Sequence, residues 1–371
     1  MTTRAVFVTS KQPFGCREDG DITLSRVLIA ALADVCELRV VALSDEPPVG
    51  SPPVELIEIA KPALAWPTLL RHSMRSRRSL IHTRFTPPAL VQTLRRLDAD
   101  VFVARRAYMA QAIVDAGRVP PRDRLCVVID ALESTVLTRR RSRFQWMLRA
   151  EAARTRRDEL ACLRAASKLA YLSDNEAEDL AGELPPAPRL DLVLAPARTP
   201  ASLQEPLAVF VGDRTWEPNA DAFRRLMRIW PRISAQTDGA RLRVVGRPAP
   251  GEATIDDASI EVSGFVQDIE AVWSHAGVLL APVRISGGVR VKVLDAARNG
   301  VPVIGTAEAI GSTRHFLPLT AHALEDEFIE ASVRLLRDSE ARLRAGRELY
   351  AASQAHHQSG ALQRQLCDLI G

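Results

Sequence analysis

The sequence predicts an α/β protein built from two domains, each with a parallel β-sheet covered by helices. Its 371 residues are long for one hydrophobic core and comfortable for two domains. Apolar runs of strand length alternate with helical patterns along the chain, which favours parallel strands joined by helices. A stretch with six prolines in residues 182–206 separates two alternating halves and is typical of a linker.

The first half contains apolar runs that alternate with helical patterns. We predict strands near residues 4–10, 38–43, 99–104, 124–130 and 168–173. This alternation indicates one parallel sheet covered by helices. The first domain is expected to span residues 1–190, and a linker is expected over residues 191–206.

The second half repeats the same pattern. We predict strands near residues 207–212, 241–246, 260–263, 277–282 and 302–306. From about Ala321 onward the apolar residues have helical spacing only, so helices are expected to cover this domain. The second domain is expected over residues 207–350, and a helical segment over 351–371 could cross back to the first domain.

The composition excludes several classes of protein. No apolar run approaches the roughly 18 residues of a membrane span, and the N-terminus lacks the apolar core of a signal peptide, so we expect a cytoplasmic protein. The five cysteines are scattered without a C-x-x-C pair, which argues against a disulfide framework and a zinc site. His356 and His357 are adjacent and do not share a helix face, so neither is expected to bind a metal.

Positive charge is concentrated in the first half of the chain. Residues 1–200 carry 30 basic and 24 acidic residues, whereas residues 201–371 carry 19 and 21. An anionic partner would therefore meet the first half. Nucleic acid is not an expected partner, because no recognition motif accompanies the charge and aromatic residues make up 5% of the chain.

Two arginine-rich segments, residues 71–79 and 139–157, carry much of this charge. The second segment contains the apolar residues Phe144, Trp146, Met147 and Leu148. Such a surface could lie on the inner face of an anionic membrane and reach a lipid-linked acceptor. It could equally be the solvated face of a helix whose apolar residues pack on its own sheet.

The stretch SGGVRVKVLDAARNGVPV, residues 286–303, contains candidate anion-binding residues. Its two glycines let the backbone N–H groups at a helix start approach a ligand, and the helix dipole there stabilises an anion. Lys292 adds a positive charge in the first turn, and Asp295 on the same face suits ribose hydroxyls better than phosphate. Asn299-Gly300 is expected to end the helix. The alternative is an ordinary turn in which Lys292 and Asp295 form a solvated ion pair.

Several segments resemble the family-four glycosyltransferases, glycosyl transferases of the group 1 type with the GT-B fold. GGVRVKVLDAARNGVPVIGT (287–306) is similar to the pattern G-x-G-x-R-x-K-x-L-E-A-x-x-x-G-x-P-V-V. VFVGDRTWEPN (209–219) resembles V-F-x-G-x-x-x-W-x-P-N, and VSGFVQD (262–268) resembles a G-F-V-x-D segment. In the first half, PFGCREDGD (13–21) is similar to the loop after the first strand, and VVIDALES (127–134) to H-N-V-E-S.

The resemblance implies two Rossmann-like domains that face each other across a cleft. It also implies transfer of a hexose from a nucleotide-sugar donor, with retention and without a required metal or cofactor. Lys292 and the glycine turn would hold the diphosphate, Asp295 the ribose, and the backbone around Phe265 and Val266 the base. The donor-binding residues are then Gly20, Gly212, Phe265, Val266, Ser286, Gly287, Gly288, Val289, Lys292 and Asp295.

The same resemblance assigns candidate catalytic roles to Lys292, Arg214 and Asp130. Arg214 would add a second cation to the diphosphate, and Asp130 occupies a position where the family often has a histidine. Two alternatives are open at this point, because Phe265 could be a core residue and Arg214 a surface residue.

Three departures from the family pattern bear on activity. Asp295 replaces the usual glutamate, Asp130 replaces the histidine, and LAPARTP (194–200) replaces P-N-G-V-D. These changes leave room for a catalytically weak donor-binding homologue that acts as a partner or activator. A nucleotide-sugar epimerase is a further alternative. The residues name neither the sugar and base of the donor nor the acceptor.

Overall fold

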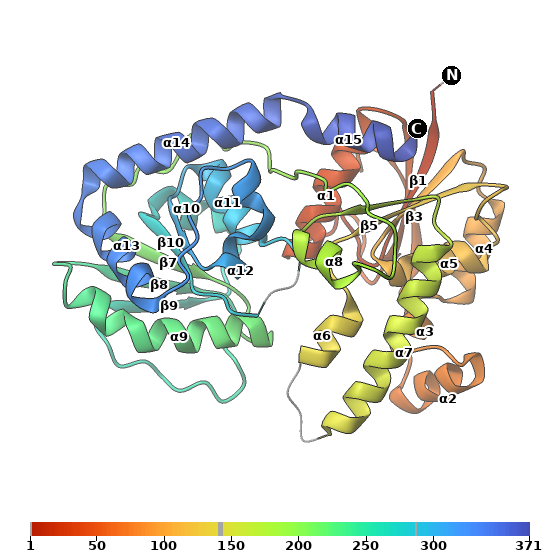
Figure 1. The fold of residues 1–371 in the computed structure, drawn as a ribbon, viewed down its shortest axis with the longest axis horizontal. Coiled ribbons are helices and arrows are strands. Elements are labelled where there is room, and N and C mark those ends of the chain that lie inside the picture. Colours follow the sequence, from red (N-terminus) through yellow and green to blue (C-terminus); the bar gives the residue numbers. More distant parts are fainter. Residues whose placement is uncertain (1, 140–143, 286–287) are drawn as a thin grey trace. The chain divides into compact units, whose positions relative to one another are not determined.

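The computed structural model describes residues 2–139, 144–285 and 288–371. The chain divides into two compact units, which are coloured by sequence in Figure 1. Unit 1 contains Met1–Leu192 and Ala361–Gly371, and unit 2 contains Val193–Gly360. Each unit has its own parallel sheet with helices packed against it, as the alternating sequence pattern predicts.

The sheet of unit 1 has, within the described residues, six parallel strands in the order β3-β2-β1-β4-β5-β6. The strands are β1 (Arg4–Thr9), β2 (Glu37–Ser44), β3 (Glu55–Ala60), β4 (Val101–Arg105), β5 (Arg124–Ile129) and β6 (Lys168–Tyr171). The sequence pattern did not predict β3, because ELIEIA lies between prolines and two of its six residues are charged. Its backbone nevertheless pairs with β2 from Arg39–Glu55 to Ser44–Ala60, which makes β3 an edge strand.

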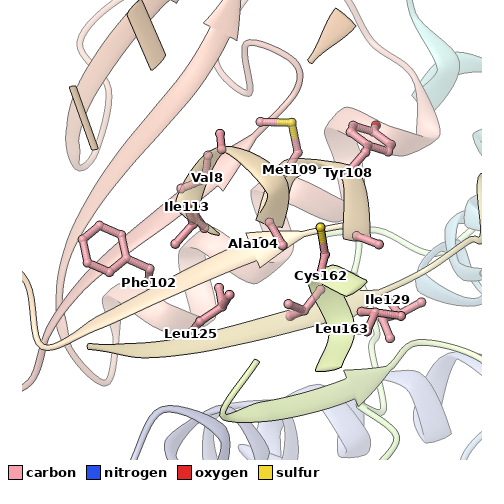
Figure 2. Close-up of a cluster of buried hydrophobic side chains, with 14 of the residues drawn as sticks. Val8, Phe102, Ala104, Tyr108, Met109, Ile113, Leu125, Ile129, Cys162 and Leu163 are labelled. Carbon is pink, nitrogen blue, oxygen red and sulfur yellow. The ribbon is translucent and has the colours of Figure 1, made fainter. Parts of the chain in front are cut away.

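The core of unit 1 lies between its sheet and the helices on one face. Figure 2 shows Val8 of β1, Phe102 of β4 and Leu125 of β5 among the buried side chains, with Ile113 and Leu163 from two covering helices. The helices of unit 1 are α1 (Gly20–Ala33), α2 (Trp66–Ser76), α3 (Leu80–Arg84), α4 (Pro88–Arg96), α5 (Ala107–Asp115), α6 (Glu133–Arg139), α7 (Gln145–Arg164), α8 (Asp174–Asp179) and α15 (Ala361–Ile370).

Helix α15 belongs to unit 1 although unit 2 precedes it in the chain. It lies against α1, β5 and β6, and Figure 1 shows its blue ribbon beside α1. Leu362, Leu366 and Leu369 are buried at helical spacing, so α15 covers the sheet with an apolar stripe. The chain enters this helix after Gly360, later than the expected boundary at 351.

The sheet of unit 2 has, in the described part of the chain, five parallel strands in the order β11-β10-β7-β8-β9. They are β7 (Leu207–Val211), β8 (Arg241–Val245), β9 (Ile260–Gly264), β10 (Val278–Ala281) and β11 (Val303–Gly305), all at predicted positions. The helical elements are α9 (Glu217–Ser234), α10 (Ile269–His275), α11 (Val291–Asn299), α12 (Ala307–Ile310), a 3-10 helix (Gly311–His315), α13 (Glu325–Arg337) and α14 (Ser339–Gln358).

The predicted linker is packed into unit 2 from Val193 onward. The backbone of Ala201 donates to the carbonyl of Asn299 at 2.8 Å, and the buried Arg342 of α14 donates to the carbonyl of Leu203 at 2.9 Å. The prolines prevent regular structure there, but the segment is held against α11 and α14.

Three broad features of the described residues bear on function. All five cysteines are free thiols, of which Cys16 and Cys367 are exposed. No cluster of three histidine, cysteine or carboxylate side chains in these ranges could hold a metal ion. No helix in the same ranges is long and apolar enough to cross a bilayer.

Candidate functional site

The strand order of unit 2 brings the predicted donor-binding residues to one edge of its sheet. The chain runs from β7 to β8 and β9 on one side, and then to β10 and β11 on the other. The order therefore reverses between β7 and β10, and ligands of open α/β sheets bind beyond the carboxyl ends of strands at such a reversal. Gly212 and Arg214 follow β7, Phe265 follows β9, and α11 follows β10.

Helix α11 begins at Val291 and ends at Asn299, and Gly300 adopts the left-handed conformation with a φ of 68°. The predicted helix stop is thus confirmed. Among the described residues, the N-cap Arg290 makes no side-chain cap to the N–H groups in the first turn of α11. Gly288, two residues before the N-cap Arg290, also has a positive φ of 68°. Ser286 and Gly287 lie outside the described residues.

Lys292 lies in the first turn of α11 and contacts the first turn of α9. Its Nζ donates to Oδ1 of Asn219 at 2.9 Å and lies 5.3 Å from the ring centroid of Phe210. Burial, and secondarily the charge of Arg290, lower the pKa of Lys292 to about 7. An amide oxygen in a buried position is therefore the partner of this ammonium, in place of the solvated ion pair considered as the alternative.

Asp295 lies one turn further along α11, and Val289 lies just before the helix. Both are partly buried. The main-chain oxygen of Asp295 accepts a hydrogen bond from the side chain of Asn299 at 2.9 Å, within the helix. The structure thus confirms that Lys292 and Asp295 occupy successive turns on one side of α11.

Asn219 is a site residue that sequence reasoning missed. Its Nδ2 donates to the carbonyl of Asp213 at 2.9 Å while its Oδ1 accepts from Lys292, so it ties the ammonium to the loop after β7. Gly212 makes this arrangement possible, because a Cβ there would lie 2.7 Å from Cγ of Asn219. The signal was present in the W-x-P-N pattern, whose last residue is Asn219.

Arg214 is 1% exposed, so the alternative that it is a surface residue is wrong. Its Nε donates to both carboxylate oxygens of Glu252 at 3.0 and 2.9 Å, and its Nη1 donates to the carbonyl of Gly246 at 3.0 Å. The guanidinium lies 4.7 Å from the ring centroid of Phe223. Nη2 is buried and has no hydrogen-bond partner among the described residues.

Phe265 is 58% exposed, so the alternative that it is a core residue is wrong. The guanidinium of Arg247 lies 5.5 Å from the centroid of its ring, and Val266 beside it is partly buried. Trp216 before α9 is 44% exposed, with Arg290 5.9 Å from its ring centroid. This edge of unit 2 thus combines cations with exposed aromatic surface, which can stack on a planar base.

Unit 1 has a polar pocket where its own strand order reverses, between β1 and β4. Its volume is about 210 Å³, and its walls are formed by Ser10, Lys11, Asp21, Lys61, Ile81, Phe85, Arg106, Tyr108 and Glu133. Sites for drug-sized ligands occupy roughly 300–1,000 Å³. This pocket therefore suits a smaller polar group, with cations and carboxylates both within reach.

The charged side chains at this pocket form one network. Nη1 of Arg106 donates to Glu133 at 2.7 Å, and Nη2 donates to Asp21 at 2.9 Å. Burial by itself would raise the pKa of Asp21. The positive charges of Arg106 and Arg105 outweigh burial, so the pKa is lowered. Burial raises the pKa of Glu133, although Arg106 opposes that shift.

Asp130 is 2% exposed and is not among the residues of the pocket wall. Its carboxylate lies between Nη2 of Arg105 and Nε of Arg106, and the latter is 3.0 Å away. Nε of Arg106 and Oδ1 of Asp130 are close enough for an ion pair, but the direction of the N–H bond does not suit a hydrogen bond. The carboxylate of Asp130 therefore orients Arg105 and Arg106 and does not line the pocket.

Gly20 is the first residue of α1 and is exposed. The N-cap of this helix is Asp19, whose Oδ1 accepts from the backbone N–H of Ile22 at 2.9 Å. Lys11 pairs with the other oxygen of Asp19 at 2.6 Å. The helix start next to Gly20 is thus already occupied by a carboxylate.

Comparisons with known proteins agree with this architecture. The family described as Glycosyl transferases group 1 matches residues 205–338. Sucrose-phosphate synthase from Thermosynechococcus elongatus has 16% identity and a TM-score of 0.68, covering 98% of this chain and 99% of its own. WaaG, a glycosyltransferase involved in lipopolysaccharide biosynthesis, has 17% identity and a TM-score of 0.65, with 99% of both chains covered.

HepE from Anabaena in complex with UDP has 12% identity and a TM-score of 0.61, with 98% of both chains covered. No curated protein sequence matches the chain significantly. At these identities the structural likeness concerns the fold, while the family match concerns the sequence of unit 2. The chain therefore has the two-domain GT-B fold, and residues 205–338 of its second unit match the model of the Glycosyl transferases group 1 family.

Proposed function

We propose that this protein transfers a hexose from a nucleotide-sugar donor bound by unit 2. The observation that carries the proposal is the partly buried Lys292 at the start of α11, because it lies at the strand reversal of a matched glycosyl transferase domain. A partly buried cation with an amide as its hydrogen-bond partner is poorly compensated. A diphosphate would supply the missing negative charge.

The chemistry of the reaction suits this arrangement. As the glycosidic bond to the diphosphate breaks, the leaving group gains negative charge. The N–H groups of α11 and the ammonium of Lys292 are donors fixed by the fold before the reaction begins, and Arg214 adds a buried positive charge in the loop after β7. These groups would stabilise the leaving group without a metal ion. Retention at the anomeric carbon is carried over from the family resemblance.

The donor and acceptor sides are assigned to different units. HepE, which shares the fold, was solved with UDP and with UDP and glucose. We therefore use UDP and UDP-glucose as probes, with Asp295 as the expected ribose ligand. The pocket of unit 1 is assigned to a polar acceptor group, because Asp21 and Glu133 can accept hydrogen bonds from sugar hydroxyls.

The test measures UDP affinity and release of UDP from UDP-glucose for the whole protein. Lys292→Ala should lower turnover on the order of a hundredfold or more while the protein stays folded. Little stability should be lost, since burial already disfavours this ammonium. Lys168→Ala is the matched control, because Lys168 lies on the strand β6 of unit 1 and bonds only a carbonyl of α15.

The outcomes separate the alternatives. Tight UDP binding with no release of UDP from any nucleotide sugar would identify a donor-binding homologue without turnover. Conversion of the donor sugar to an isomer without transfer would identify an epimerase. Equal turnover and equal UDP affinity in wild type and Lys292→Ala would remove the donor-site assignment altogether.

A further inference from the structure

Helix α2 carries an exposed apolar stripe. Trp66, Leu70 and Met74 follow one another at intervals of four residues and are 63%, 39% and 61% exposed. The row of residues beside this strip on the same side of the helix, Leu69 and Ser73, is buried. Residues four apart lie above one another on a helix, so the three side chains form a continuous strip about 12 Å long.

The start of α7 carries a second group of exposed apolar side chains. Phe144, Trp146 and Met147 are 49%, 72% and 50% exposed. The body of α7 contacts α2, because Nη2 of Arg154 donates to Oγ of Ser73 at 3.0 Å. In Figure 1 both segments lie in the part of unit 1 that is remote from its sheet.

These two groups account for most of the exposed large apolar side chains found in unit 1. Elsewhere in the described part of this unit, Val49 is the remaining member of that class. Exposing two tryptophans and two methionines to water is unfavourable. Binding to a partner would bury their apolar area and lower the free energy. The grouping therefore indicates a surface that meets a partner.

The charge around this surface is positive. The sequence contains no acidic residue between Lys61 and Asp98, and none between Glu133 and Glu151. Arg71 and Arg75 follow the apolar residues of α2 around the helix and are exposed. Arg149 is exposed in the same way on α7. In the described structure, no carboxylate forms an ion pair with any of these three guanidinium groups.

We propose that the α2–α7 surface, formed by Trp66, Leu70, Met74, Phe144, Trp146 and Met147 with its flanking arginines, docks on an anionic lipid bilayer. Tryptophan and methionine side chains would enter the boundary between headgroups and acyl chains. The arginines would remain at the phosphate level, with their stems along the apolar region. This inference goes beyond the proposed function, because it concerns where unit 1 binds and does not depend on the donor site.

The test is co-sedimentation of the whole protein with vesicles. Phosphatidylcholine vesicles containing about 30 mol% phosphatidylglycerol should bind the protein, and pure phosphatidylcholine vesicles should not. Binding should weaken steeply as salt approaches about 0.5 M, because the Debye length then falls well below 10 Å. Arg71→Gln with Arg75→Gln should reduce vesicle affinity roughly 25-fold, at about fivefold for each charge.

The apolar contribution is tested separately. Trp66→Ala with Met74→Ala should reduce vesicle affinity by about tenfold or more without changing the melting temperature, because both side chains are exposed. The matched controls are Val49→Ala with Leu324→Ala, and Arg314→Gln with Arg347→Gln. These side chains are also exposed but lie outside the α2–α7 surface. Both control pairs should bind vesicles as the wild type does.

Several results would overturn the proposal. Equal binding to neutral and anionic vesicles, or none to either, would remove the role of the charged lipid. Equal loss of affinity in the control pairs would show an unspecific effect of charge or apolarity. A concentration-dependent dimer that disappears in Trp66→Ala with Met74→Ala, or preference for a short DNA duplex over anionic vesicles, would assign the surface to a different partner.

Discussion

The affinity of this protein for UDP should fall as the pH rises above neutrality, and Lys292 should be the cause. Burial lowers the pKa of its ammonium from 10.5 to about 7. Above that pH the amine is mostly neutral when the site is free. A diphosphate beside it favours the charged form and raises the pKa, so binding takes up a proton from solution.

The size of the effect follows from this shift. If the bound diphosphate returns the pKa of Lys292 towards 10.5, each pH unit above about 7 costs roughly tenfold in affinity. Between about pH 7.5 and 9.5 the dissociation constant should therefore rise about 100-fold, equivalent to about 2.7 kcal/mol. The terminal phosphate titrates near pH 6, below this window, so its own charge remains constant there.

The assay is titration calorimetry with UDP at several pH values, in two buffers of different ionisation enthalpy. Wild type should take up close to one proton on binding above about pH 7.5. Lys292→Arg keeps its charge throughout, because the guanidinium does not deprotonate in this range, so its affinity should change little with pH. Lys168→Arg should retain the slope of the wild type. The same pH slope in wild type and Lys292→Arg would refute the reasoning.

Four further outcomes are expected. Asp295→Ala should weaken the binding of UDP and of the donor alike, since ribose contacts change little during the reaction. Asp295→Glu should retain most of the affinity. Calorimetry with UDP and turnover of the donor distinguish these two variants. Gly212→Ala should displace Asn219 and lower turnover, because the new Cβ would lie 2.7 Å from its Cγ, whereas unchanged rates would show that this contact is unimportant. Asp130→Ala should cost about 1–3 kcal/mol of unfolding free energy, because Arg105 and Arg106 each lose one carboxylate partner and keep Asp21, and UDP affinity should persist; a melting curve unaffected by the change would contradict this. Burial raises the pKa of Glu159 from 4.5 to about 7, so its contribution to stability is complete below pH 4.5 and is lost as the pH rises through 7. The melting temperature of Glu159→Gln minus that of wild type should therefore increase over this pH range, and a constant difference would argue against the shift.

The sequence alone determined the features that depend on residues close together in the chain. The strands of unit 2 were predicted because an apolar run of strand length between turn residues is a local signal. The start of α11 near Lys292 and its end at Asn299 follow from glycines on both sides of the helix. The family resemblance likewise rests on short ordered segments, and the match over residues 205–338 supports it.

Only the tertiary structure decided which distant residues meet. Residues 55–60 form strand β3 because their backbone can pair with the free edge of β2. The sequence ELIEIA does not show that such an edge lies beside it. Helix α15 joins unit 1 through an apolar stripe whose counterpart lies far away in the chain.

The candidate site shows the same division. The sequence identified Lys292 and Arg214 as cations, but their partners lie elsewhere in the chain: Asn219 in the first turn of α9 and Glu252 in the loop after β8. Asp130 was a catalytic candidate by resemblance alone, and the fold places its carboxylate between Arg105 and Arg106. Charge and residue type are local properties, whereas burial and pairing depend on the packing of the whole chain, which is why only the tertiary structure decided them.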